Sequence, residues 1–231
     1  MVDVFPIQRP NLPIFSPTPE ANALAFRLGT TWDRTRSEEA ILWGHHDEIQ
    51  EFSIETSQSA IYYNNKRRFG SVFVGVASAE GMDDEIIVTQ GTNTSIYQGA
   101  PKDCAEVRSL VQADGVVEVM ASIHGITPQS ITLTGIGIFV AHNRQQGLNL
   151  AINNLDSETV DPCGTPCRPF IDEHPATTEK MRIVTTCVDE LGNIVASRSF
   201  LWPEMIRRYA NVVTPLTQRE VMARTPARSR Y

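Results

Sequence analysis

The sequence predicts an α/β fold, in which helices cover both faces of a sheet of about five strands. Helical and strand patterns alternate from residue 37 onward, in the order helix, two strands, helix, strand, helix, two strands. The strand pattern at 130–142, "SITLTGIGIFVAH", is apolar along nearly its whole length. A strand of this kind is usually buried on both faces, so a helix layer is expected on each side of the sheet.

The N-terminal part of the chain is expected to hold an arm and one long helix. Five prolines fall within the first 20 residues, which favours an extended, Pro-rich arm over 1–36. A helix is expected over 37–65, because Ser37 is a suitable N-cap and apolar residues follow at helical spacing. The adjacent residues Asn64 and Asn65 would end this helix.

The middle of the chain shows a hairpin followed by a helix. Runs of β-branched residues at 69–78 and 85–91 are separated by "AEGMDD", and this pattern predicts a β-hairpin. A helix over 100–125 would begin near Pro101 and end at Gly125, which is the usual asymmetry of helix ends. The buried strand described above follows it.

The last part of the chain is expected to complete one domain. The polar stretch 143–161 is expected to be a surface loop, and a short helix is expected near 163–173. Two strands over 181–202 would be joined by a turn at "DELGN", and "PEMIRRY" is a short helix candidate. The domain is therefore expected to cover 37–206, with a coiled tail at 207–231.

Composition and charge exclude several classes of protein. The formal net charge is −7, whereas a protein that binds duplex nucleic acid usually carries a basic face. No apolar run is long enough for a transmembrane helix. The N-terminus has an early acidic residue and lacks the regions of a secretory signal. We expect a cytoplasmic protein that binds no membrane, and the charge disfavours a nucleic-acid partner.

The four cysteines do not form a disulfide framework in a chain of 231 residues. In a reducing compartment, the close spacing of Cys163 and Cys167 favours metal binding or catalysis over a disulfide. Cys187 lies in the middle of a strand pattern, "VTTCVDE", and is expected to be an ordinary core residue.

Three cysteines stand where predicted helices begin. Cys104 is at the start of the first such helix, and the segment with Cys163 and Cys167 opens the next one. A helix N-terminus carries a positive partial charge that stabilises a thiolate, which is the form that binds metal. Three thiolates leave the fourth position of a zinc ion open, as in catalytic sites. Glu106 would lie near enough to move protons to and from a metal-bound water.

The two motifs around these cysteines resemble those of one known family. "CAE" at 104–106 and "PCGTPCR" at 162–168 are similar to the paired motifs of the zinc-dependent cytidine deaminase superfamily. With cysteine as the first ligand, the chain resembles the three-cysteine branch, which contains the small cytidine deaminases and blasticidin S deaminase. The segments "SVFVGVAS", "GTN" and "DELGNIVASRSFLWPEMI" resemble further parts of the family, so the resemblance covers roughly 45–206.

The resemblance implies a three-layer α/β/α fold with a mixed sheet and the activity of a hydrolytic deaminase. Cys104, Cys163 and Cys167 would bind Zn²⁺. Zinc-bound hydroxide would attack the ring carbon of a cytosine-type base, with Glu106 as the proton shuttle. The substrate would be a nucleoside or a nucleoside-like metabolite. Small members of the family are commonly tetramers, which implies a homo-oligomer, either a dimer or a tetramer.

Further residues are candidates for contact with the substrate or the thiolates. Asn93 matches the ribose-binding position of the family, and the backbone of Ala105 would hold the base. Arg168 matches an arginine placed against the thiolates, and Arg108 lies one position from the place of a second. Aromatic rings can line a pocket or stack on a base, and two rings are candidates here: Phe73 and Tyr97. Phe73 fits a core position equally well.

The chain departs from the family pattern in two places. Position 95 holds a serine, Ser95, where the family has a glutamate that binds a ribose hydroxyl. The cysteine motif has three residues between Cys163 and Cys167 where the family usually has two. Two alternatives stay open. The Arg-rich tail keeps open a deaminase of single-stranded nucleic acid, and the missing carboxylate keeps open a non-catalytic zinc-binding member of the family.

Overall fold

The computed structural model describes residues 18–59, 68–93, 104–143, 162, 167–189 and 191–210. The strands within these residues, in chain order, are β1 (Phe69–Ser78), β2 (Glu85–Thr92), β3 (Thr132–Asn143), β4 (Arg182–Val188) and β5 (Ile194–Leu201). The helices are α1 (Pro19–Thr35), α2 (Glu38–Gly44), α3 (His46–Ser59), α4 (Ala105–His124), α5 (Cys167–Glu173) and α6 (Trp202–Ala210). A short 3₁₀ helix, Pro128–Ser130, precedes β3.

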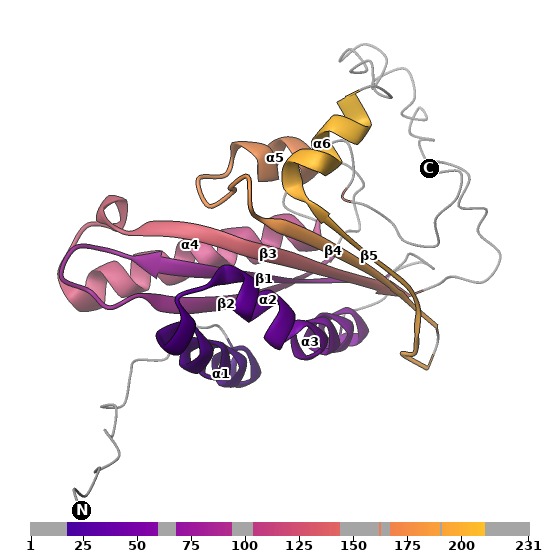
Figure 1. The fold of residues 1–231 in the computed structure, drawn as a ribbon, viewed down its shortest axis with the longest axis horizontal. Coiled ribbons are helices and arrows are strands. Elements are labelled where there is room, and N and C mark those ends of the chain that lie inside the picture. The colour runs from indigo at the N-terminus through magenta and orange to yellow at the C-terminus, as the bar shows by residue number, and fades with distance from the viewer. Residues whose placement is uncertain are drawn as a thin grey trace, which may run out of the picture.

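The described strands form one mixed sheet in the order β2-β1-β3-β4-β5. Strands β3 and β4 run parallel, and the other neighbours run antiparallel. Helices α1, α2 and α3 pack on one face, and α4, α5 and α6 pack on the other (Figure 1). The predicted α/β class, with helices on both faces of a mixed sheet, is therefore confirmed. Among the described helices, none combines the length and apolar character needed to cross a bilayer.

Strand β3 lies at the centre of the sheet, and its side chains contribute to a hydrophobic core on each face. Its residues 135–142 are buried without interruption, as the apolar pattern predicted. The pairing with β1 shifts between Val74 and Gly75, where β3 carries the extra residue Ile136. Ile136 packs with the core under α1–α3, whereas Ile138 packs with the core under α4.

The extended arm expected over 1–36 is wrong for its second half, which forms helix α1. Thr18 caps this helix by accepting a hydrogen bond from the backbone N–H of Ala21 at 3.2 Å. Pro19 is the first helical residue, where a missing N–H costs nothing and the fixed φ suits a helix. Pro19 is one of the five prolines from which an extended arm is predicted, but in the structure it begins a helix. Residues 1–17 lie outside the described residues.

The single helix expected over 37–65 is also wrong, because the structure has two helices there. Ser37 caps α2 as predicted, its hydroxyl accepting a backbone N–H at 3.3 Å. The helix is interrupted at His45, whose backbone has φ −129° and ψ 17°. Helix α3 then ends at Ser59, and residues 60–67 lie outside the described part of the chain.

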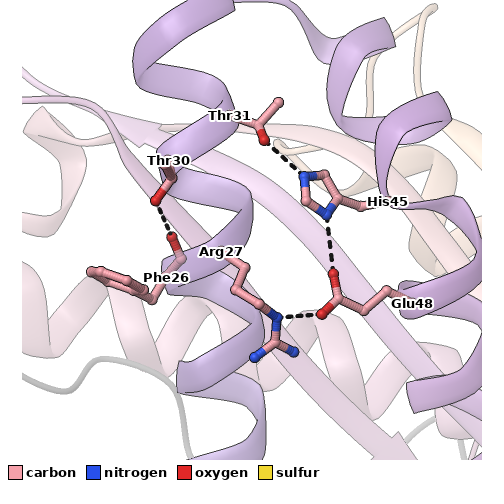
Figure 2. Close-up of polar contacts among 6 residues, drawn as sticks. All are labelled: Phe26, Arg27, Thr30, Thr31, His45 and Glu48. Carbon is pink, nitrogen blue, oxygen red and sulfur yellow. Dashed lines mark hydrogen bonds and ion pairs between the residues drawn. The ribbon is translucent and has the colours of Figure 1, made fainter.

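Polar side chains connect α1 to the break between α2 and α3 (Figure 2). His45 Nε2 lies 2.8 Å from Thr31 Oγ1 of α1, and His45 Nδ1 lies 3.0 Å from Glu48 Oε2. Glu48 also forms an ion pair with Arg27 of α1. Partly exposed pairs of this kind each contribute at most about 1 kcal/mol. These contacts therefore orient α1, while its buried apolar residues hold it on the sheet.

The turn predicted at "DELGN" joins β4 to β5. Asp189 Oδ1 accepts hydrogen bonds from the backbone N–H groups of Leu191 and Asn193, at 2.9 and 2.8 Å. Its Oδ2 accepts one from the side-chain amide of Asn193 at 2.9 Å. These bonds, the Asn193 side chain first, lower the pKa of Asp189 below its usual value. Gly192 has φ 88°, a conformation that favours glycine.

Helix α1 belongs to the folded core, so a truncation within it should destabilise the domain. Leu28 has no exposed surface and packs in the core under α1–α3. Leu28→Ala should lower the free energy of unfolding by about 2–5 kcal/mol, measured by urea denaturation. Glu48→Gln, which weakens the partly exposed contacts of Glu48 with Arg27 and His45, should lower it by no more than about 1 kcal/mol. Equal, small effects of the two substitutions would show that α1 is a detachable arm.

Candidate metal centre

Helices α4 and α5 bring three predicted site residues together at their first residues. Cys104 is the N-cap of α4, with an extended backbone, and Glu106 lies in the first turn. Cys167 is the first residue of α5. Two sulfur atoms and one carboxylate oxygen from these residues all lie within 4.8 Å of one another. The structure thus joins residues that the two sequence motifs place far apart in the chain.

This group is largely withdrawn from solvent. Glu106 is 6% exposed and Cys167 is 1% exposed, whereas Cys104 is half-buried. Cys167 Sγ lies 3.8 Å from Glu106 Oε2, within reach of a weak S–H···O hydrogen bond. Apolar side chains of α4 and α5, among them Val107 and Ile171, form the core beside the group. Of these three residues, Cys104 is therefore the most exposed to solvent.

The chemistry of the donor set fits a zinc ion. Zn²⁺ binds thiolate sulfur and carboxylate oxygen, and the two cysteines offer the softer ligands that it favours. Two thiolates and a carboxylate repel one another where water is scarce, and a divalent cation between them would remove that repulsion. The N-terminus of α4 adds a positive partial charge at Cys104. Cys104 and Cys167 would hold the ion, with Glu106 beside it.

Helix α4 reaches this position because its first turn lies directly on the backbone of β2. A Cβ atom at Gly91 would lie 2.2 Å from the carbonyl oxygen of Ala105 and 2.7 Å from the backbone N of Ser109. Only glycine allows this approach without a shift of the helix. Gly91 is the first residue of the "GTN" segment, and the sequence alone does not indicate that a helix packs against it.

His174, the residue after α5, connects this helix to α4. His174 Nδ1 accepts a hydrogen bond from the backbone N–H of Ala176 at 3.2 Å. The ring must therefore carry its proton on Nε2, which lies 3.2 Å from a carboxylate oxygen of Asp114 on α4. The Trp202 indole N–H, from α6, donates to Asp172 of α5 at 2.9 Å. Sequence reasoning missed these contacts, because no local pattern pairs residues so far apart.

Arg168 contacts Pro162, the residue before the remaining cysteine of the motif. Its Nε donates to the carbonyl oxygen of Pro162 at 2.8 Å. Pro162 is buried and immediately precedes Cys163 in the chain. Cys163 itself lies outside the described residues, so its role as the third ligand stays a prediction. The same holds for two proposed substrate contacts: Ser95 and Tyr97.

The other proposed substrate contacts have defined places. Asn93 directly follows β2, and its side-chain oxygen accepts the backbone N–H of Phe69 at 2.9 Å. Ala105 is buried, with its carbonyl against β2. Arg108 is half-buried one turn into α4. Phe73 has no exposed surface and lies in the core under α4, so of its two expected roles the structure shows the core ring.

A buried pair lies on β3 and β4 near the carboxyl ends of these strands. Cys187 is 1% exposed, which confirms it as a core residue. It stands opposite His142 in the parallel ladder. The His142 ring is also buried, and its centroid lies 5.4 Å from that of Phe69 at the start of β1.

Comparison with solved structures finds a likeness in overall structure, whereas the comparisons of sequence find none. No protein-family model and no curated protein matches the sequence. Among solved structures, a cytidine deaminase from Burkholderia pseudomallei is similar, with a TM-score of 0.36 and 17% sequence identity. The match covers 69% of this chain and 94% of that chain. A likeness at this TM-score has no weight for function.

The close contact at Gly91 can be tested with a matched glycine on α4. Gly91→Ala should lower the free energy of unfolding by about 1–3 kcal/mol, because the added methyl group meets helix backbone. Gly115→Ala is the control, since a Cβ there meets nothing within 4 Å. It should raise stability by about 0.5–1 kcal/mol, as expected within a helix. Urea denaturation measures both, and a neutral Gly91→Ala would contradict the close approach.

Proposed function

We propose that this protein is a zinc-dependent hydrolytic deaminase acting on a cytosine-type base in a nucleoside or a nucleoside-like metabolite. The observation that carries the proposal is the meeting of Cys104, Glu106 and Cys167. It is the arrangement that the resemblance to zinc-dependent cytidine deaminases implies for these positions. A structural zinc site is usually closed by four ligands and does not require an enclosed glutamate beside two cysteines.

The reaction would divide the work between the metal and the protein. When bound, Zn²⁺ lowers the pKa of a coordinated water and so makes hydroxide available at neutral pH. Cys104 and Cys167 would hold the ion, and Cys163 is the predicted third ligand. Hydrolysis forms a bond between the ring carbon and a water oxygen, and it breaks the bond to the exocyclic amine, which leaves as ammonia.

Glu106 is the residue suited to move the proton between these two steps. Its carboxylate lies with the two sulfur atoms, so it can reach a water in the same place. It would accept a proton from that water and return it to the departing amine. Burial of Glu106 shields the transferred proton from bulk solvent.

The role of Glu106 is tested by a substitution that keeps its shape. Glu106→Gln should retain zinc but lower the rate of ammonia release by about 10²–10⁴-fold, because the amide cannot carry the proton. Zinc content is measured by elemental mass spectrometry, and ammonia release is measured over cytidine, cytidine nucleotides and nucleoside antibiotics. Glu118→Gln, at an exposed position of the same helix, is the control and should change neither quantity.

The same assays separate the proposal from its alternatives. Ammonia release by Glu106→Gln at the wild-type rate would contradict the mechanism. Turnover of single-stranded oligonucleotides but not of free nucleosides would favour a nucleic-acid deaminase. A zinc-loaded protein with no turnover on any substrate of the panel would favour a non-catalytic binding protein. Cys104→Ala should lose zinc, and full zinc retention would show that Cys104 is not a ligand of the ion.

A further inference from the structure

Three buried hydroxyl groups join the first turns of α4 to the sheet. Ser109 Oγ donates a hydrogen bond to the carbonyl oxygen of Glu106 at 2.8 Å. The same Oγ lies 3.1 Å from Ser71 Oγ of β1. Thr89 Oγ1 of β2 donates to the carbonyl oxygen of Ser109 at 2.6 Å. Ser71, Thr89 and Ser109 have no exposed surface.

The direction of these hydrogen bonds follows from the number of protons. A hydroxyl group has one hydrogen to donate, and that of Ser109 is directed at the Glu106 carbonyl. The bond between the two serines therefore runs from the Ser71 hydroxyl to Ser109 Oγ. The chain of bonds begins on β1 and ends on the backbone of Glu106, the proposed proton carrier.

The position of these hydroxyls calls for a reason other than stability. A buried hydroxyl loses its hydration, and the bonds it gains offset that loss with little net contribution. Small apolar residues would fill the same space without this cost. Hydrogen bonds are directional, however, whereas apolar contacts between a helix and a sheet permit small sliding. The three hydroxyls therefore define one position of the α4 first turn over β1 and β2.

We propose that Ser109, supported by Ser71, is a positioning residue for Glu106 in the proposed deaminase. The inference rests on the proposed function for its kinetic consequence. A shift of the first turn would move the Glu106 carboxylate and Cys104 together relative to Cys167 on α5. Displacements of the order of 1 Å in a reacting group can lower rates strongly. Ser109 acts through Glu106 and has no contact with the substrate in this role.

The decisive experiment compares Ser109→Ala with a matched serine elsewhere. Ser53 of α3 has no exposed surface and makes the same type of bond, its hydroxyl donating to the carbonyl oxygen of Gln50 at 2.7 Å. It lies on the opposite face of the sheet from the metal centre. Ser53→Ala removes a comparable buried bond without touching α4, so it controls for a general loss of stability.

Three quantities are measured on each zinc-loaded variant: kcat and KM for the best substrate, and the affinity for Zn²⁺ by competition with a chelator. Ser109→Ala should lower kcat and zinc affinity by about 10–100-fold each, the size of effect found when a residue that orients a metal site from outside its ligands is removed. KM should stay unchanged. Ser53→Ala should leave all three quantities at the wild-type values.

A second variant keeps the test valid if Ser109→Ala does not fold. Ser71→Ala leaves the Ser109 bond to Glu106 but removes its support, so it should lower kcat and zinc affinity in the same direction by a smaller factor. The double variant should be no worse than Ser109→Ala, because the two residues act in one chain of bonds. The proposal is overturned if the variant that folds matches Ser53→Ala in both kcat and zinc affinity.

Failure of this inference is distinguishable from failure of the proposed function. A wild-type protein that binds zinc and releases no ammonia would contradict the deaminase activity alone. The comparison of zinc affinities between Ser109→Ala and Ser53→Ala would still decide whether Ser109 positions the first turn of α4.

Discussion

The candidate site depends on one close contact, between the backbone of β2 at Gly91 and the first turn of α4. Without a side chain at Gly91, the helix backbone lies against the strand. Cys104 and Glu106 belong to this turn, so their places are set by the sheet itself. Hydrogen bonds from the Ser71 and Thr89 hydroxyls to Ser109 then connect the start of the helix to β1 and β2. The site is therefore built on rigid elements, which suits chemistry that needs close positioning.

Helix α5 completes the site from the same face of the sheet. It follows β3, and it is held on α4 by the contact between His174 and Asp114. The Trp202 indole N–H of α6 donates a hydrogen bond to Asp172 and so connects α5 to α6. Helix α4 near its start and helix α5 at its end are thus held by contacts that do not themselves involve the cysteines. The arrangement brings Cys167 to Cys104 without requiring a long flexible side chain from either helix.

Helices and strands whose position depends on the local sequence pattern could be predicted from the sequence. The β-branched runs gave β1 and β2, and Gly125 ends α4 with φ 66°, as a glycine after a helix commonly does. Helix α1 is not predicted from the sequence, because Pro19 at its first position follows four other prolines and so resembles part of an extended segment. The break at His45 was missed because the apolar spacing continues through it, whereas packing of α1 against α2 and α3 decides where the axis bends. Local propensity does not contain such tertiary contacts.

For the candidate site, the sequence indicated the cysteines and the glutamate that meet there but not the residues that support them. Cys104, Glu106 and Cys167 belong to two motifs, and motifs of this kind can be read without knowing the fold. Ser71, Thr89 and Ser109 belong to three different elements, and each alone is an ordinary residue. Their relation exists only once β1, β2 and α4 are packed. Phe73 illustrates the reverse case, since a ring placed near the family's pocket proves to be part of the core.

The meeting of α4 and α5 also has a consequence for the unfolded chain. Glu106 and Cys167 are 61 positions apart in the sequence, and strand β3 lies between them. An ion held by Cys104 and Cys167 would close this whole segment into a loop, as a covalent cross-link would. Because such an ion would bind the folded chain and not the unfolded chain, its binding free energy would add to the free energy of unfolding. The contact that arranges the reacting groups would then also oppose unfolding of the α4–β3–α5 half of the domain.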